Sequence, residues 1–120
     1  MGINVKKILI VDDENVQVES LIRGLKISGF KAEGAISGIE ALKILDNSFD
    51  LIVTDFEMPG MNGLELLNEI RKTHPTLPVI LTTAFGDKEL VVDAMHKKCN
   101  GFLDKPFTLD VLIQEINKVL

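Results

Sequence analysis

Four short apolar runs in the chain each lead into acidic, hydroxyl or basic residues, and this repeated pattern limits the folds available to it. The runs occupy residues 8–11, 51–53, 79–81 and 102–103. The polar residues that follow them include Asp12 and Asp13, Asp55, Thr83 and Lys105. If the runs are parallel strands, their carboxyl ends lie at one edge of a sheet. Three carboxylates, a hydroxyl and an ammonium group would then gather at that edge.

Segments with helical periodicity lie between these runs. Apolar residues recur three or four positions apart around residues 18–25, 41–45, 66–70 and 109–120, and more weakly around 87–97. Ser37, Asn62 and Thr108 stand at predicted helix N-termini, and Gly29 is placed to end the first helix. A weaker, more polar strand is predicted at 31–35.

Strand and helix therefore alternate five times, which is typical of a parallel sheet with right-handed crossovers. The runs that begin at Ile8, Leu51 and Val79 indicate central strands buried on both faces, whereas the strands near 31–35 and 102–103 suit the edges. We expect an α/β fold: a flavodoxin-like, doubly wound, five-stranded parallel sheet in the order 2-1-3-4-5, with five helices. The length of 120 residues fits one domain, residues 1–120.

The composition argues against several classes of function. The formal net charge is −5 and there is no Trp or Tyr to stack on bases, so direct nucleic-acid binding is not expected. Cys99 is the single cysteine, which excludes an internal disulfide and fits a reducing, cytoplasmic compartment. No N-terminal apolar run is long enough for a signal peptide or a membrane span, so neither is expected.

The three carboxylates predict a site for a hard divalent cation. Clustered without a cation, Asp12, Asp13 and Asp55 would repel one another. Mg²⁺ relieves this repulsion because it prefers a few carboxylate oxygens together with water molecules. The alternative for any one of these residues is a role as a helix cap or turn former, and the metal itself could be structural. The sequence contains no Walker A motif, dinucleotide fingerprint or nucleophile elbow.

With these residues placed, the sequence resembles the receiver domain of bacterial two-component response regulators. The matching residues are the Asp12-Asp13 pair, the segment 54–63 around Asp55, Thr83-Ala84, and Lys105-Pro106-Phe107. Each piece is weak alone, but their order, spacing and placement at strand ends are specific together. The match covers essentially the whole chain and implies a phosphoprotein of phosphorelay signal transduction.

The resemblance implies a role for each polar residue at this edge. Asp55 resembles the phosphoacceptor, a carboxylate that is ionised at pH 7 and attacks phosphorus without a general base. Asp12 and Asp13 resemble the acids that hold Mg²⁺. By analogy, Asp55 and the backbone carbonyl of Glu57 complete the protein ligands of the metal. Lys105 would pair with the bound phosphoryl group.

Two further positions resemble the switch residues of the family. Thr83 is preferred over Thr82 as the hydroxyl that bonds the phosphoryl group, because the small residue after Thr83 matches the family pattern. Phe102 resembles the aromatic residue that moves inward on activation, although the family often has Tyr there. The alternative for Phe102 is simple packing of an edge strand. The family pattern also implies a cis bond between Lys105 and Pro106.

The implied function is a switch that accepts a phosphoryl group from the phosphohistidine of a histidine kinase or a phosphotransfer protein. Phosphorylation would bias a two-state equilibrium and remodel the face made by the fourth helix, fifth strand and fifth helix. This face would meet an output domain or target protein, and it is the family's usual dimerisation surface. The domain would catalyse its own phosphorylation and slow dephosphorylation without being a conventional enzyme. No output domain is evident, which fits either a stand-alone regulator or a fragment of a longer one.

Two alternatives belong to other classes of protein. A Mg²⁺-dependent phosphohydrolase would also use Asp55 as a nucleophile. However, phosphatases of the haloacid dehalogenase type carry a second Asp two residues later, where this chain has Glu57. They also enclose the substrate with a cap segment that is not evident here. A receiver-like binding module would signal without phosphorylation, and the complete set of candidate site residues argues against it.

Overall fold

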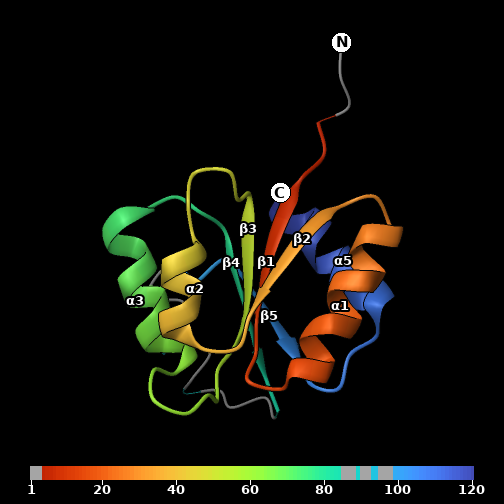
Figure 1. Cartoon of the computed structure of the whole chain (residues 1–120). Helices are drawn as coiled ribbons and strands as arrows, with labels where there is room; N and C mark the ends of the chain where they lie inside the picture. The colour runs from red at the N-terminus through yellow and green to blue at the C-terminus, as the bar shows by residue number, and fades with distance from the viewer. Residues whose placement is uncertain (1–3, 85–88, 90–92, 95–98) are drawn as a thin grey trace.

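Five parallel strands form one sheet through the centre of the molecule (Figure 1). The structure, a computed structural model, describes residues 4–84, 89, 93–94 and 99–120. The strands are β1 (Lys7–Val11), β2 (Lys31–Ala35), β3 (Leu51–Asp55), β4 (Val79–Thr83) and β5 (Gly101–Asp104). Their spatial order is β2-β1-β3-β4-β5, and every neighbouring pair is parallel. The predicted flavodoxin-like order, with its second and fifth strands at the edges, is confirmed.

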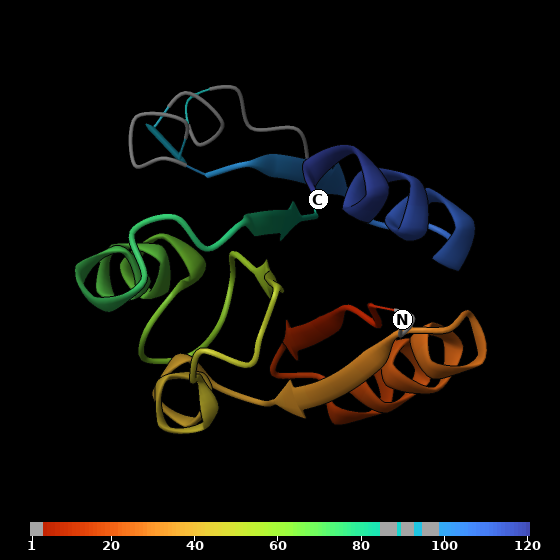
Figure 2. The same cartoon turned by 90° about the horizontal axis from the view of Figure 1, so that it is seen from above.

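Helices cover both faces of this sheet. They are α1 (Asn15–Ile27), α2 (Gly38–Ile44), α3 (Gly63–Thr73) and α5 (Leu109–Val119). Figure 2 shows α1 and α5 on one face and α2 and α3 on the other. The helix predicted around 87–97 lies largely outside the described residues. Within that range the structure describes only Glu89, Asp93 and Ala94, and these three are helical. None of the described helices combines the length and the apolar character needed to cross a membrane.

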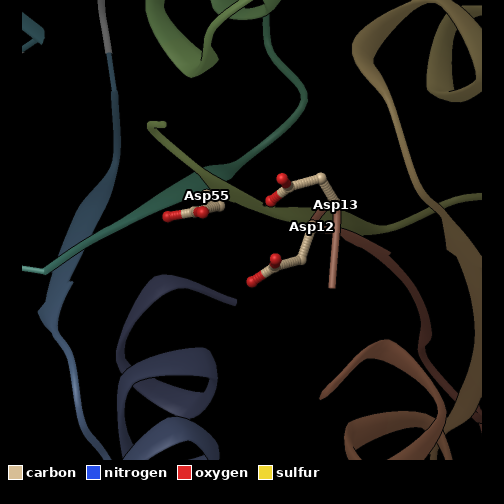
Figure 3. Close-up of side chains that lie close together, drawn as sticks. All are labelled: Asp12, Asp13 and Asp55. Carbon is tan, nitrogen blue, oxygen red and sulfur yellow. The ribbon is translucent and has the colours of Figure 1, made fainter. Parts of the chain in front are cut away.

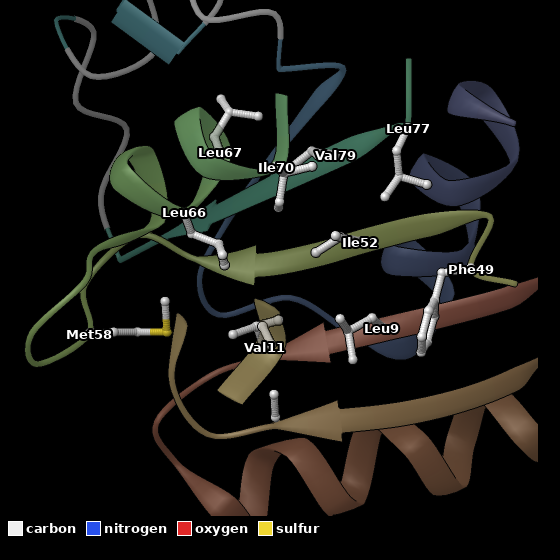
Figure 4. Close-up of a cluster of buried hydrophobic side chains, with 12 residues drawn as sticks. Leu9, Val11, Phe49, Ile52, Met58, Leu66, Leu67, Ile70, Leu77 and Val79 are labelled. Atoms are coloured by element: carbon white, nitrogen blue, oxygen red, sulfur yellow. The ribbon is translucent and has the colours of Figure 1, made fainter. Parts of the chain in front are cut away.

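Alternation along the strands divides the apolar residues between two cores. On β1, Leu9 and Val11 pack toward α2 and α3, in the core drawn in Figure 4, whereas Ile8 and Ile10 pack toward α1 and α5. All five residues of β3 and of β4 are buried, as expected for central strands between two helical layers. Burying one large aliphatic side chain contributes about 1.5–3 kcal/mol, so these two cores supply most of the driving force for folding.

Side-chain caps begin the helices where the sequence predicts them. At α3, Asn62 Oδ1 accepts a hydrogen bond from the Glu65 N–H at 2.9 Å, and Glu65 Oε1 accepts one from the Asn62 N–H at 3.0 Å, which completes a capping box. At α2, Ser37 Oγ accepts from the Glu40 N–H at 3.1 Å. In a complete capping box the Glu40 carboxylate would also accept from the Ser37 N–H. Here it accepts instead from the Ile36 N–H at 3.3 Å, one residue earlier.

Gly29 ends α1 as predicted. Its φ of 98° lies in the left-handed region that only glycine adopts readily. The N–H groups of Gly29 and Phe30 donate to the carbonyls of Lys26 and Leu25 at 3.1 and 3.0 Å, which is a Schellman turn. Thr108 caps α5, because its side chain accepts a backbone hydrogen bond of 3.2 Å. These termini set where each helix starts or stops relative to the sheet.

Candidate functional site

Three carboxylates meet at the carboxyl edge of the sheet. One oxygen each from Asp12, Asp13 and Asp55 lies within 4.8 Å of the others (Figure 3). The parallel register brings them together, because Val11 at the end of β1 pairs with Thr54 next to the end of β3. Asp12 and Asp55 are buried, whereas Asp13 is exposed. The acidic cluster is therefore held by the protein on one side and open to solvent on the other.

Hydrogen bonds fix the Asp12 carboxylate within this cluster. Its Oδ1 accepts from the backbone N–H of Glu14 at 3.0 Å, and its Oδ2 accepts from the Lys105 ammonium group at 2.8 Å. The Asp12 backbone N–H donates to the Ala35 carbonyl of β2 at 3.1 Å. A buried carboxylate is tolerated when a charged partner and hydrogen bonds replace its hydration, and Asp12 has both.

Lys105 reaches the cluster from the loop that follows β5. Its Nζ lies 2.8 Å from Asp12 Oδ2 and 3.3 Å from Asp55 Oδ2. Its backbone N–H donates to the Thr83 carbonyl at the end of β4, at 2.6 Å. The Lys105–Pro106 bond is cis, as the family pattern implied. The ammonium group thus bridges the carboxylate that follows β1 and the carboxylate at the end of β3.

Negative charge is in excess at this site. Burial raises the pKa of the Asp55 carboxyl above 3.8; the Lys105 ammonium opposes the rise and the Asp12 charge adds to it. Burial by itself lowers the pKa of Lys105, but its hydrogen bond to Asp12 and the charges of Asp55 and Asp12 outweigh burial and raise it above 10.5. Both shifts favour positive charge at the cluster, so the arrangement is chemically suited to a further cation.

Two cavities flank the cluster. One, of about 450 Å³, is lined by Asp13, Phe56, Glu57, Met58, Pro59 and Asn62. The other, of about 540 Å³, is lined by Glu14, Gln17, Ala84, Lys105, Pro106 and Phe107. The family resemblance implies the backbone carbonyl of Glu57 as a metal ligand. Glu57 borders the same cavity as Asp13. The two cavities leave room for small groups on either side of the carboxylates.

Gly63 is a site residue that sequence reasoning missed. A Cβ at this position would lie 2.6 Å from the Asp55 carbonyl oxygen and 2.9 Å from Phe56 Cα. The Gly63 N–H donates to the Phe56 carbonyl at 2.8 Å. A glycine is therefore required for α3 to begin directly against the end of β3. The available signal was a glycine just after the N-cap Asn62, where a better helix former would otherwise be expected.

Thr82 and Thr83 are both buried at the end of β4. Thr82 pairs with Asp55 across β3 and β4, and Thr83 pairs with Asp104 across β4 and β5. Successive strand residues face opposite sides of a sheet, so the two hydroxyls are not equivalent. The structure places both threonines at the predicted edge, and the choice of Thr83 as the switch hydroxyl stays a prediction.

Phe102 lies on the edge strand β5 and is half-buried. It packs against a small apolar cluster that includes Leu81 and Ala94, and its backbone pairs with Leu81 of β4. This placement joins β4 to the segment that precedes β5. Packing of an edge strand, the alternative interpretation of Phe102, is therefore observed, and its movement on activation stays a prediction.

The single cysteine and the two histidines lie apart from the acidic cluster or outside the described residues. Cys99 is half-buried, its Sγ donates to the carbonyls of Gly101 and Val79 at 3.1 and 3.4 Å, and burial raises the pKa of the thiol. Cys99 therefore has the character of a small residue packed against the core. His74 follows α3, and its backbone N–H donates to the Ile70 carbonyl at 2.7 Å. His96 lies outside the described residues.

Comparison with known proteins identifies relatives along almost the whole chain. A family model for the response regulator receiver domain matches residues 8–117. Chemotaxis protein CheY-3 of Vibrio cholerae is 38% identical over 119 residues, which cover 94% of this chain and 90% of that protein. A cyclic di-GMP phosphodiesterase of Thermotoga maritima is 33% identical over 113 residues, which cover 94% of this chain but 30% of that protein.

Solved structures agree with the sequence relatives. Response regulator protein TrrA from Thermotoga maritima, in complex with Mg²⁺-BeF, superposes with a TM-score of 0.85 at 35% identity, covering 97% of this chain and 100% of that one. With a family model that matches 8–117 and relatives of this identity, the chain belongs to the response regulator receiver domain family.

Proposed function

We propose that this domain, residues 1–120, is a phosphorylation-activated switch of a two-component system. A histidine kinase or a phosphotransfer protein would donate a phosphoryl group from its phosphohistidine to Asp55. The proposal rests on one observation: three carboxylates from two strands and the ammonium group of Lys105 converge at one edge of the sheet. A structural role for any single residue does not explain that convergence.

Asp12, Asp13 and Asp55, together with the backbone carbonyl of Glu57, are the groups that would hold Mg²⁺. Carboxylate and carbonyl oxygens are the ligands this ion prefers, and the exposed side of Asp13 leaves space for its water molecules. When bound, Mg²⁺ neutralises charge on the phosphoryl oxygens during transfer. The related TrrA structure is a complex with Mg²⁺-BeF, which supports this assignment.

Asp55 would act as the nucleophile. One of its carboxylate oxygens forms a bond to phosphorus while the bond from phosphorus to the donor imidazole nitrogen breaks. The imidazole leaves with that electron pair and, already protonated on its other nitrogen, departs neutral. Burial raises the pKa of Asp55, and the neighbouring Lys105 ammonium opposes this rise and so favours the reactive carboxylate. Slow hydrolysis of the resulting acyl phosphate would return the domain to its resting state.

Lys105 and Thr83 would recognise the phosphoryl group once it is attached. Lys105 Nζ is 3.3 Å from Asp55 Oδ2, so it can pair with a group bound there by a small shift away from Asp12. Thr83 would donate its hydroxyl hydrogen to a phosphoryl oxygen. Since the Lys105 N–H is bonded to the Thr83 carbonyl, the two residues are already coupled through the backbone.

Phe102 and the edge strand β5 would transmit the change. The half-buried ring packs on Leu81 of β4, two residues before Thr83, so a shift at Thr83 alters its surroundings. A partner that prefers the altered face, such as an output domain or a target protein, would bind the phosphorylated form more tightly. Two further expectations belong to the same proposal: dimerisation through the face of the predicted fourth helix, β5 and α5, and a cytoplasmic location in line with the single cysteine.

Intact mass spectrometry after incubation with acetyl phosphate and Mg²⁺ tests the proposal. We expect the wild type and Asp110→Asn, a control that removes an exposed acid at the start of α5, each to gain one phosphoryl group. Asp55→Asn should gain none, and chelation of Mg²⁺ should abolish the gain in all three proteins.

Other outcomes would assign the domain to a different class. A wild type that stays unmodified under these conditions would favour a binding module that signals without phosphorylation. Repeated turnover of a small phosphomonoester, with Asp55 as the nucleophile, would favour a phosphohydrolase. Mass gain in Asp55→Asn equal to that of the wild type would place the phosphoryl group on another residue.

A further inference from the structure

The strands begin at the edge of the sheet opposite to the acidic cluster (Figure 1). A cavity of about 500 Å³ lies there, between the start of β2, the end of α1 and the loop that precedes β3. We call it the amino-edge pocket, and its polar and aromatic lining comprises Lys7, Lys26, Phe30, Lys31, Glu33 and Ser48. Its volume is in the range of small-molecule sites.

The turn at Gly29 builds this pocket. The Schellman turn reverses the chain within three residues, so Lys26 in the last turn of α1 and Lys31 at the start of β2 line the same cavity. Phe30 lies between them in sequence and is half-buried, with part of its ring in the core beneath α1. The Lys31 N–H donates to the Lys6 carbonyl at 2.9 Å, which fixes the start of β2 against β1.

One lysine of the pocket is neutralised within the protein. Lys7 Nζ lies 2.8 Å from Glu33 Oε2, donates to Ser48 Oγ at 2.8 Å and stands 4.2 Å from the centre of the Phe49 ring. These contacts hold the Lys7 ammonium in one place and cancel its charge against the acid that lines the pocket. Lys7 and Glu33 therefore form a wall of the pocket with little net charge.

The charges of Lys26 and Lys31 are not cancelled in this way. Within the part of the chain that the structure describes, neither forms an ion pair with a carboxylate, and both are exposed. A lysine in the last turn of a helix favours the helix dipole, and a lysine on an edge strand discourages aggregation. These general roles explain each residue separately. They do not explain two uncompensated ammonium groups around one cavity in a chain with a net charge of −5.

We infer that the amino-edge pocket binds a small organic dianion, a phosphomonoester or a dicarboxylate with an apolar body. Lys26 and Lys31 pair with the anionic group, the exposed part of Phe30 packs against the apolar body, and the Lys7–Glu33 pair contributes lining with little net charge. The pocket and the acidic cluster lie at opposite edges of the sheet. Binding here is thus independent of phosphorylation at Asp55, and either proposal can fail alone.

Amide chemical-shift titration by NMR tests the inference on the whole chain, with metal removed by a chelator. The probes are phenyl phosphate, phthalate and the neutral benzyl alcohol. We expect saturable shifts at Lys26, Phe30 and Lys31 with at least one dianion and none with benzyl alcohol. Tighter binding of phenyl phosphate would indicate a phosphate site, and tighter binding of phthalate a carboxylate site.

Two variants and a matched control complete the experiment. Lys26→Gln and Lys31→Gln should each weaken binding by about tenfold, since each removes one charge-assisted contact. Lys43→Gln removes an exposed lysine from the last turn of α2, outside the pocket, and should leave binding unchanged. Thermal unfolding of each variant verifies that it is folded.

Several results would overturn the inference. The inference is wrong if neither dianion produces saturable shifts at the pocket. It is also wrong if Lys26→Gln and Lys43→Gln weaken dianion binding equally. Shifts confined to Asp12 and Lys105 would assign the anion to the carboxyl edge instead. If an acidic peptide shifted the pocket amides while neither small dianion did, the site would be a protein-docking surface.

Discussion

The interior of the sheet and its carboxyl edge make opposite contributions to folding. In the interior, side chains such as Ile52, Leu66 and Ile80 are completely buried, and each stabilises the folded chain by removing apolar surface from water. At the carboxyl edge, Asp12 and Asp55 are also buried, but the raised pKa of Asp55 shows that its charge is unfavourable there. The comparison teaches that this edge is not arranged for stability, which is the expected signature of a functional site.

The largest expected effect lies in the interior. Leu66 of α3 is 0% exposed, and Leu66→Ala should lower the free energy of unfolding by about 2–5 kcal/mol because it leaves a cavity between α3 and the sheet. Urea unfolding at pH 7 measures the change. The control Ile39→Ala removes a side chain on α2 that is 59% exposed, and it should change the same quantity by less than about 0.5 kcal/mol. Similar losses for both variants would contradict the division between interior and surface.

An intermediate effect is expected at Lys105. Lys105→Met keeps most of the side-chain volume but leaves Asp12 and Asp55 without their ammonium partner, so it should destabilise the metal-free protein by about 2 kcal/mol. Because the folded pKa of Lys105 is raised above 10.5, its stabilising contribution is complete below pH 10.5 and is lost as the pH rises through the folded pKa. Urea unfolding at pH 7 and at more alkaline pH checks both the size and this trend. A difference from the wild type that grows with alkaline pH would refute the assignment.

The smallest of the three effects has the opposite sign. Asp55→Asn should raise the free energy of unfolding of the metal-free protein at pH 7, by less than the loss expected for Lys105→Met, since it removes a buried charge whose pKa is raised. An acid with a raised folded pKa costs stability as the pH rises from 3.8 through the folded pKa. The advantage of the variant should therefore vanish below pH 3.8.

Mg²⁺ sharpens this last prediction. If the cluster holds the ion, Mg²⁺ should stabilise the wild type more than Asp55→Asn and reduce the difference between them. Thermal unfolding with Mg²⁺ and with a chelator measures the stabilisation of each protein by the ion. Asp110→Asn serves as the control. Destabilisation by Asp55→Asn at pH 7 without metal would show that the carboxylate is favourable where it lies.

Much of the fold could be predicted from the sequence because the signals are local. The apolar runs that became β1, β3 and β4, the caps at Asn62 and Thr108, and the glycine that ends α1 each depend on a few neighbouring residues. The sheet order followed from which strands were apolar enough to be central. The acidic cluster was predictable for the same reason, since parallel strands bring their carboxyl ends to one edge.

What could not be predicted depends on contacts between distant residues. The bridge from Lys105 to Asp12 joins positions 93 residues apart, and no sequence pattern fixes which carboxylate the ammonium approaches more closely. The role of Gly63 depends on how closely α3 approaches β3, which is a packing distance and not a periodicity. The shift of the Glu40 bond from Ser37 to Ile36 likewise depends on local backbone geometry.

The complete burial of β3 has a mechanical consequence for signalling. Every residue of this strand is enclosed between two helical layers, and close-packed interiors yield little to local force. A bulky group added at its end therefore cannot be accommodated by retreat of the strand. At the margin of the sheet, by contrast, β5 has an exposed terminal residue and only one neighbouring strand. If Asp55 is phosphorylated as proposed, the margin of the sheet is therefore expected to move more readily than its close-packed centre.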